Sequence, residues 1–204
     1  PWNWERCASH IRNLRGRKGF PDSDTINFLR LEVSLKDGKI RDSLSGLTVR
    51  RRWRKAIYAI LYYYSLSPDM NETGKFVEFR RLPGGYAFFG AFLKRTIQPL
   101  IEMLKESPIT LREALMVMGG ESMPYGDFSV KIKALPQIPV LLIFWMSSEE
   151  FPPHATMLFD NNVAHHLPTE IVAILGELIR KRIWDARRVL EIIPQFGIAK
   201  NHKT

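Results

Sequence analysis

The sequence predicts an α+β fold, in which a mostly antiparallel sheet, made of an early hairpin and a later meander, is packed by about four to five helices. Three observations lead to this prediction. Strand-like and helix-like segments do not alternate strictly, as they would around a parallel sheet. The turn signal Asp37-Gly38 lies between two early strand-like segments, and further strands follow one another between residues 128 and 159. Hydrophobic residues make up 45% of the 204 residues, which is enough for a buried core.

One domain is expected, because the chain shows no internal repeat and no convincing linker. We place this domain at residues 26–193. Residues 1–25 lack periodicity and are interrupted by Arg, Gly and Pro, so we expect an irregular basic arm that Trp2 and Trp4 hold against the domain. Residues 194–204 are expected to form a loose tail.

The hairpin and the first helix are predicted from a change of period. Apolar residues are mostly two apart in 27–34, and after Asp37-Gly38 the returning strand is expected at 39–43. Residues 49–65 have apolar side chains at helical spacing. Thr48 is the expected N-cap of this helix.

The middle of the chain is expected to hold a short strand at 75–81, a Pro-Gly-Gly turn and a long helix at 86–105. Pro99 lies inside the long helix and predicts a kink or a split. Thr110 begins a capping box, so a short helix is expected from there to Met118.

The meander is predicted from three strand patterns and is followed by the last helix. Residues 128–135 alternate as a half-exposed strand does, and 140–146 are continuously apolar, as is typical of a central strand covered on both faces. A short third strand is expected at 155–159. The last major helix is predicted over 168–183, and 185–193 extend it.

The charge is uneven along the chain. The net charge is +9, and residues 1–60 hold 14 Lys and Arg against 6 Asp and Glu. The basic patch, as we call its densest part, consists of Arg50, Arg51, Arg52, Arg54 and Lys55. Such a patch attracts an acidic protein partner, an anionic cofactor or nucleic acid, or it is a solvated face without a ligand. Nucleic acid is the weakest of these interpretations, because no zinc-finger, RRM-like or KH pattern occurs.

Several classes of protein and site are not expected. The longest apolar run, 138–146, is far shorter than the roughly 20 residues of a membrane helix. Cys7 is the single cysteine and cannot by itself hold a zinc ion or an iron–sulfur cluster. His165 and His166 are adjacent, which is not the spacing of a common ligand pair, so we expect a helix lead-in or surface histidines. With no secretory signal pattern at the start, a cytoplasmic protein is expected.

The first candidate site is a group of acids and one histidine at strand ends and turns: Asp127, Glu149, Glu150, His154 and Asp160. In an antiparallel meander such residues can converge at one edge of the sheet. Carboxylates with a histidine suit a divalent metal or general acid–base chemistry. The structural alternative is that these are ordinary turn and loop residues.

A second candidate site is an anion or cofactor seat formed by Arg80, Arg81, Gly84 and Gly85. The glycines expose backbone N–H groups, the following helix offers its N-terminus, and arginine forks bind carboxylate or phosphate. The alternative is a structural turn with an arginine paired to Glu78.

Short motifs follow one another in a specific order along the chain. They are Phe79-Arg80-Arg81-Leu82-Pro83-Gly84-Gly85-Tyr86, Gly119-Gly120, Gly126-Asp127, Leu135-Pro136, Glu149-Glu150-Phe151-Pro152, Leu158-Phe159-Asp160 and Leu167-Pro168-Thr169-Glu170. In these motifs the chain resembles an uncharacterised family of anaerobic bacteria and archaea, domain of unknown function 3786, over residues 28–183. The resemblance implies an accessory subunit of anaerobic one-carbon, corrinoid or metal–sulfur metabolism.

Two positions depart from the family pattern. Ser148 stands where the family's Asp-Glu-Glu-Phe block begins with an acid, and Arg81 stands where the family has an acidic residue. Both changes remove negative charge, so they weaken a reading in which clustered acids bind a metal.

The favoured function is therefore a non-enzymatic accessory or binding subunit of a larger assembly, which binds a protein partner or an anionic, corrinoid-type cofactor through the basic N-terminal half, with the basic patch as the partner-binding surface. The alternative is a metal- or acid–base-dependent enzyme with its site around Asp127, Glu149, Glu150 and His154. A nucleic-acid-binding protein is the third interpretation.

Overall fold

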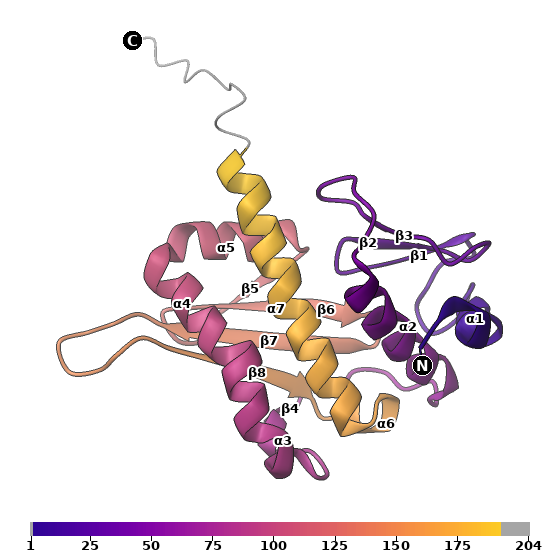
Figure 1. The fold of residues 1–204 in the computed structure, drawn as a ribbon. Coiled ribbons are helices and arrows are strands. Elements are labelled where there is room, and N and C mark those ends of the chain that lie inside the picture. The colour runs from indigo at the N-terminus through magenta and orange to yellow at the C-terminus, as the bar shows by residue number, and fades with distance from the viewer. Residues whose placement is uncertain (1, 193–204) are drawn as a thin grey trace.

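The fold contains two antiparallel sheets and belongs to the predicted α+β class (Figure 1). The computed structural model describes residues 2–192, so the tail expected at 194–204 lies outside the described residues. One sheet has three strands in the order β1-β2-β3, and the other has five in the order β4-β8-β7-β6-β5. No helix among the described residues is long and apolar enough to cross a membrane.

The five-stranded sheet carries the meander that the sequence predicts. Its strands are β4 (Phe76–Glu78), β5 (Glu121–Met123), β6 (Phe128–Leu135), β7 (Ile138–Trp145) and β8 (His154–Asp160). The predicted interior strand is confirmed, because β7 lies in the middle of the sheet and is buried along its length apart from Trp145. Neighbouring side chains of a strand point to opposite faces, so this continuous burial means that both faces of β7 are covered.

The three-stranded sheet differs from the prediction at its first strand. The strands are β1 (Thr25–Phe28), β2 (Leu31–Ser34) and β3 (Ile40–Asp42). The expectation of one strand over 27–34 is wrong, because Leu29 and Arg30 have positive φ angles of 48° and 58° and form a tight turn between β1 and β2. Such turns favour Asn and Gly. A buried Leu in this position gives no turn signal in the sequence.

The helices cover the sheets and connect them. They are α1 (Trp4–Arg12), α2 (Arg51–Leu66), α3 (Gly85–Phe92), α4 (Gln98–Glu106), α5 (Pro108–Val117), α6 (Val163–His166) and α7 (Thr169–Ile192). Figure 1 shows α7 and the α3–α4 segment running across the five-stranded sheet, with α2 between α7 and the three-stranded sheet. The expected extension of the last helix through 185–193 is confirmed as far as Ile192.

Helix α1 corrects the expectation of an irregular arm at 1–25. Asn3 caps the helix by accepting a hydrogen bond of 3.2 Å from the Arg6 N–H. Cys7 and Ile11 lie one turn apart and are buried, so the segment is part of the core. The Arg, Gly and Pro residues that suggest an arm lie mostly after this helix.

Trp2 and Trp4 hold the start of the chain against α2, as expected. The Trp2 ring lies 5.2 Å from the Tyr62 ring, and the Trp4 ring lies 6.0 Å from the Tyr58 ring, measured between centroids. Aromatic pairs at such distances stabilise the docking of one element on another.

Two predicted N-caps are displaced by two or three residues. The N-cap of α2 is Arg50 rather than Thr48, and no side chain caps its first turn. The N-cap of α5 is Ser107 rather than Thr110, and the Ser107 Oγ accepts a hydrogen bond of 3.2 Å from the Thr110 N–H. Ser107 precedes Pro108, and proline favours the first position of a helix.

The predicted split of the long helix at Pro99 is confirmed. A π-helical segment, Leu93–Ile97, separates α3 from α4, and Pro99 lies in the first turn of α4. The strand expected at 75–81 is shorter, because a 3-10 turn, Phe79–Arg81, follows β4 directly.

Candidate functional site

Two residues of the first candidate site, Asp127 and His154, lie on one row of cross-strand neighbours in the five-stranded sheet. Asp127 directly precedes β6, and Trp145 and His154 are paired positions of β7 and β8. The Asp127 carboxylate accepts a hydrogen bond of 2.6 Å from the Met146 N–H. The Trp145 and His154 rings lie 5.5 Å apart. Since Trp145 stands between them, the backbones of Asp127 and His154 are two strand spacings apart, or about 10 Å.

The other acids of this candidate site lie in different surroundings. Glu149 and Glu150 are exposed in the loop between β7 and β8. Asp160 is fully buried and accepts hydrogen bonds from the backbone N–H groups of Thr73, Gly74 and Asn162, at 2.8 to 3.1 Å. Within residues 2–192 no group of three or more His, Cys, Asp and Glu side chains could hold a metal ion.

The second candidate site is a turn whose polar groups contact one another. Arg80 forms an ion pair with Glu78. The Gly85 N–H donates to the Leu82 carbonyl at 2.8 Å, and Gly84 has a φ of 71°. A Cβ on Gly85 would lie 2.1 Å from the Phe79 carbonyl oxygen, so only glycine fits there. These contacts support the tight turn before α3.

A small cavity brings together residues that the sequence assigned to two separate sites. It has a volume of about 290 Å³ and is lined by Arg80, His154 and, on its apolar wall, Phe89, Phe92 and Met157. The Arg80 guanidinium lies 5.7 Å from the centre of the Phe89 ring. The lining of the cavity is therefore mostly apolar, with one histidine and the ion pair of Arg80 and Glu78.

The basic patch lies at the N-terminal end of α2. The first turn of α2 contains no acidic residue, and Arg50, Arg51 and Arg52 are exposed. The N-terminus of a helix carries positive partial charge, so cations there repel the helix dipole. Among the described residues, the one ion pair of the patch joins Arg52 to Glu177 at 3.6 Å. The patch therefore projects positive potential that the surrounding side chains do not neutralise.

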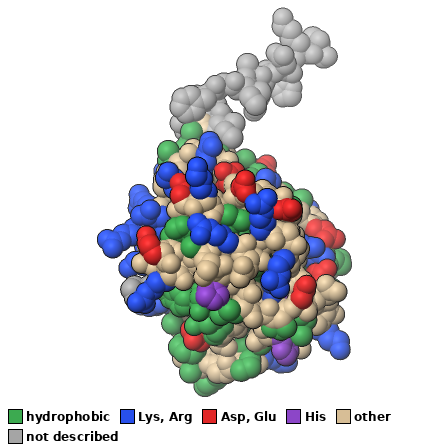
Figure 2. Space-filling model, turned by 90° about the vertical axis from the view of Figure 1, so that its right-hand side faces the viewer, with side chains coloured by type: hydrophobic (Ala, Val, Ile, Leu, Met, Phe, Trp, Pro, Cys, Tyr) green, Lys and Arg blue, Asp and Glu red, His purple; other side chains and the backbone are tan. Residues whose placement is uncertain are grey.

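A cleft opens beside the patch, between α2 and the C-terminal half of α7. We call it the α2–α7 cleft; its volume is about 590 Å³. Arg50 and Trp53 line one wall, Lys181 and Arg188 line the other, and Leu47 stands at its edge with 69% of its surface exposed. Figure 2 shows the side of the molecule that lies to the right in Figure 1, where Lys and Arg side chains are spread among hydrophobic and acidic ones.

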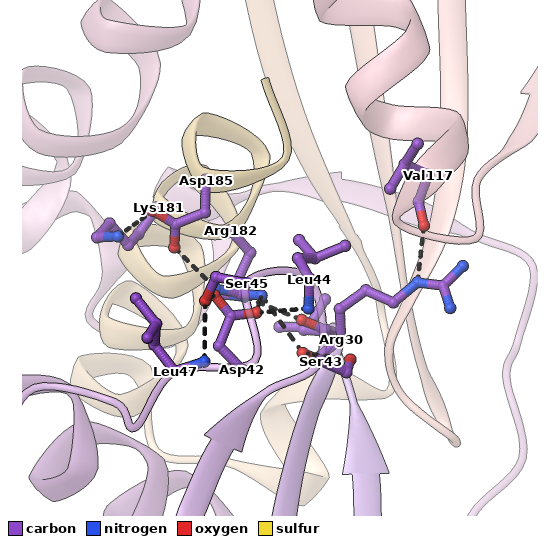
Figure 3. Close-up of polar contacts among 11 residues, drawn as sticks. Arg30, Asp42, Ser43, Leu44, Ser45, Leu47, Val117, Lys181, Arg182 and Asp185 are labelled. Atoms are coloured by element: carbon purple, nitrogen blue, oxygen red, sulfur yellow. Dashed lines mark hydrogen bonds and ion pairs between the residues drawn. The ribbon is translucent and has the colours of Figure 1, made fainter. Parts of the chain in front are cut away.

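The floor of the cleft is a buried ion-pair network (Figure 3). Arg182, 3% exposed, donates to Asp42 at 2.5 Å, to Asp185 at 2.7 Å and to the Leu29 carbonyl at 3.0 Å. Asp42 also accepts from the Leu44 N–H at 2.9 Å. Burial raises the pKa of Asp42, but the Arg182 guanidinium and the hydrogen bonds from the Leu44 N–H and the Ser45 hydroxyl together outweigh burial and leave this pKa below its usual value. The network fixes α7 to the three-stranded sheet.

Arg182 is not among the predicted site residues, although the sequence contains a signal for it. Arg182 is in phase with the buried positions Leu175, Leu178 and Ala186 of α7. A charged residue on the buried stripe of a helix requires a partner. Its partner Asp42 is 140 positions away, so the signal indicates that a pair exists without identifying it.

A second buried polar cluster was also missed, and it corrects the expectation of surface histidines at His166. This residue is 2% exposed; its Nδ1 lies 3.0 Å from the Ser67 Oγ and its Nε2 lies 3.2 Å from the Met70 carbonyl. Lys18 donates to the Ser67 and Pro68 carbonyls, both at 2.8 Å. Burial, together with the Lys18 charge, lowers the pKa of His166 to about 4. The cluster satisfies carbonyl groups at the C-terminal end of α2.

The comparisons with known proteins identify a family and no characterised relative. A family model described as a domain of unknown function (DUF3786) matches residues 22–182. No curated protein matches the chain. No solved structure matches it either.

Proposed function

The chain belongs to the DUF3786 family, and from this premise we propose that it is a non-enzymatic binding subunit that docks an acidic protein partner on the basic patch and the adjoining α2–α7 cleft. The observation that carries this proposal is the accumulation of arginines at the positive end of α2 without acidic residues in its first turn. The setting that the resemblance implies is anaerobic one-carbon, corrinoid or metal–sulfur metabolism.

The position of the arginines lowers the stability of the free protein, and it favours the docking of an acidic partner. Repulsion between the patch and the helix dipole destabilises the free protein, and an acidic surface laid on the patch would remove that repulsion. Exposed arginines also accelerate the association of an acidic partner through long-range attraction.

The cleft supplies the apolar part of an interface. Arg and Trp are the residue types that most often carry binding free energy at protein interfaces, and Arg50, Trp53 and Arg188 lie together there. Leu47 is a large apolar side chain that is left mostly in water. An acidic partner with an apolar anchor would match these groups.

The proposal is tested by copurification from the native anaerobic source, followed by cross-linking. The variant Arg51→Glu/Arg54→Glu reverses two charges of the patch. The control Arg112→Glu/Lys133→Glu makes the same charge change at exposed positions of α5 and β6. We expect the partner to copurify with the wild type and the control and to be lost from the patch variant. Equal recovery with both variants would contradict the proposal.

The enzyme alternative has weaker geometric support. The carboxylate of Asp127 already accepts a backbone hydrogen bond, and the indole of Trp145 lies between it and His154. If this alternative holds, Glu149→Gln abolishes the binding of a metal that natively purified protein carries in stoichiometric amount. The nucleic-acid interpretation requires binding to duplex DNA that weakens steeply with salt.

A further inference from the structure

Arg180 is a half-buried cation without a partner. Its Nε atom is buried and has no hydrogen-bond acceptor, and no ion pair or hydrogen bond involves any part of its guanidinium within residues 2–192. The nearby carboxylate of Glu177 is contacted instead by Arg52, at 3.6 Å, and by Arg95, at 3.5 Å. Burial lowers the pKa of Arg180, which shows that its charge is poorly solvated. A guanidinium in this state favours an anion that supplies acceptor oxygens.

Arg180 lines a groove between α4 and α7, which we call the α4–α7 groove. Its volume is about 720 Å³, within the roughly 300–1,000 Å³ that small-molecule sites usually have. Lys94 and Gln98 contribute polar groups from the other wall, and Ile101 and Trp184 contribute apolar surface. The groove is thus lined by cationic donors and by hydrophobic side chains.

The charges of the groove leave a net positive site. Lys105 pairs with Glu102 at 2.8 Å, so the only carboxylate on the walls is already neutralised by a cation. Lys94 and Arg180 remain without an ion pair among the described residues. Lys94 belongs to the π-helical segment Leu93–Ile97, and π-helical turns occur frequently at functional sites.

We propose that the α4–α7 groove binds a small organic anion, whose carboxylate or phosphate group is held by Arg180 and Lys94 and whose apolar body packs on Trp184 and Ile101. The planar fork of an arginine matches two oxygens of either group, and the apolar wall selects an anion with a hydrophobic part over a bare ion. Trp184 is the residue that this groove shares with the lining of the α2–α7 cleft, and the ligand proposed for the groove goes beyond the docking function proposed above.

Phenyl phosphate is the probe for this site, with inorganic phosphate and benzyl alcohol as the anion-only and apolar-only comparisons. Binding is followed by isothermal titration and by the NMR signal of the Arg180 Nε–H. We expect phenyl phosphate to bind the wild type, to shift this signal and to bind at least tenfold more tightly than either comparison molecule.

The decisive variant is Arg180→Met, which keeps an unbranched chain as far as the position of Nε and removes the charged guanidinium. It is expected to weaken phenyl phosphate binding at least tenfold. Arg112→Met, at an exposed position of α5 that lines neither the groove nor the α2–α7 cleft, is the control and is expected to leave the affinity unchanged.

Two further variants keep the proposal testable if Arg180→Met does not fold. Arg180→Lys retains the charge and loses the fork, and Lys94→Met removes the second cation; each is expected to weaken binding several-fold. Unchanged affinity in the folded Arg180 variants, or no binding of phenyl phosphate to the wild type at millimolar concentration, would overturn the proposal.

Discussion

Single residues with buried charges determine how α7 is attached to the rest of the molecule. Arg182 and Asp42 neutralise each other's buried charge, because the Arg182 Nη2 atom lies 2.5 Å from the Asp42 Oδ1 atom. Removing one member of a buried pair leaves the other charge unsatisfied. The pair is therefore expected to matter more for stability than the many exposed pairs, which contribute little.

Substitution of Arg182 tests this view. Arg182→Met is expected to lower the free energy of unfolding by about 3–5 kcal/mol, because it leaves Asp42 as an uncompensated buried charge. Urea denaturation measures the effect. The exposed Arg188→Met is the control and is expected to change stability by less than about 0.5 kcal/mol. Equal effects of the two substitutions would show that the network does not hold α7.

Buried His166 predicts a loss of stability in mild acid. Its pKa is about 4 in the folded protein, below its usual value of about 6.5, so the folded state binds this proton less readily than the unfolded state. The contribution is fully present above about pH 6.5 and is lost as the pH falls towards 4, by up to about 3 kcal/mol.

The pH dependence is measured by denaturation at a series of pH values between neutrality and pH 4. His166→Asn is expected to flatten the curve in this window, whereas His165→Asn, at an exposed position, is expected to leave it unchanged. Asp42 contributes in a separate window, because its lowered pKa places the loss of its contribution below about pH 4. A wild-type curve that stays level from neutrality to pH 4 would contradict the assignment to His166.

At the scale of elements, the turn before α3 is fixed by a close approach of backbone to backbone. Gly85→Ala is expected to destabilise the protein by about 1–3 kcal/mol, since its Cβ would overlap the Phe79 carbonyl oxygen. Gly90→Ala in the same helix meets no atom within 4 Å and is expected to stabilise by up to about 1 kcal/mol. Thermal unfolding of both variants checks these opposite signs, and a shift of the same sign in both would refute the role of the turn.

The elements that the sequence predicts are those whose signals are local. The continuous apolar run around Leu142 identifies the interior strand, and Pro99 identifies the break between α3 and α4. The turn at Leu29 and Arg30 escapes prediction because tertiary packing, rather than turn-forming residues, holds its positive φ angles. Strand β5 was not expected either, because three residues carry too little pattern.

The candidate sites also differ in whether a local signal predicts them. The density of Lys and Arg identifies the basic patch directly in the sequence, and the strand pattern predicts that Asp127 and His154 lie at one end of the meander. The distant neighbours, Lys94 for Arg180 and Asp42 for Arg182, cannot be predicted in this way, because each lies more than 70 positions away along the chain. Only the folded structure shows that the Arg182 guanidinium has carboxylate and carbonyl partners and that the Arg180 guanidinium has none among the described residues.

At the scale of the whole molecule, α7 is the element on which the two proposed binding regions meet. Its C-terminal half forms one wall of the α2–α7 cleft and one wall of the α4–α7 groove, and Trp184 lines both. The buried network beneath the cleft keeps this half of α7 in place. A rigid helix between an interface and a ligand site is a route by which occupation of one site could affect the other.

The central claim is that the basic patch provides the electrostatic attraction for an acidic partner, and the salt dependence of binding to poly-L-glutamate tests it most directly. The slope of the logarithm of affinity against the logarithm of salt concentration reports how many charge contacts form. We expect Arg51→Gln/Arg54→Gln to reduce this slope and Arg112→Gln/Lys133→Gln to leave it unchanged. Equal slopes for the wild type and both variants would contradict the claim.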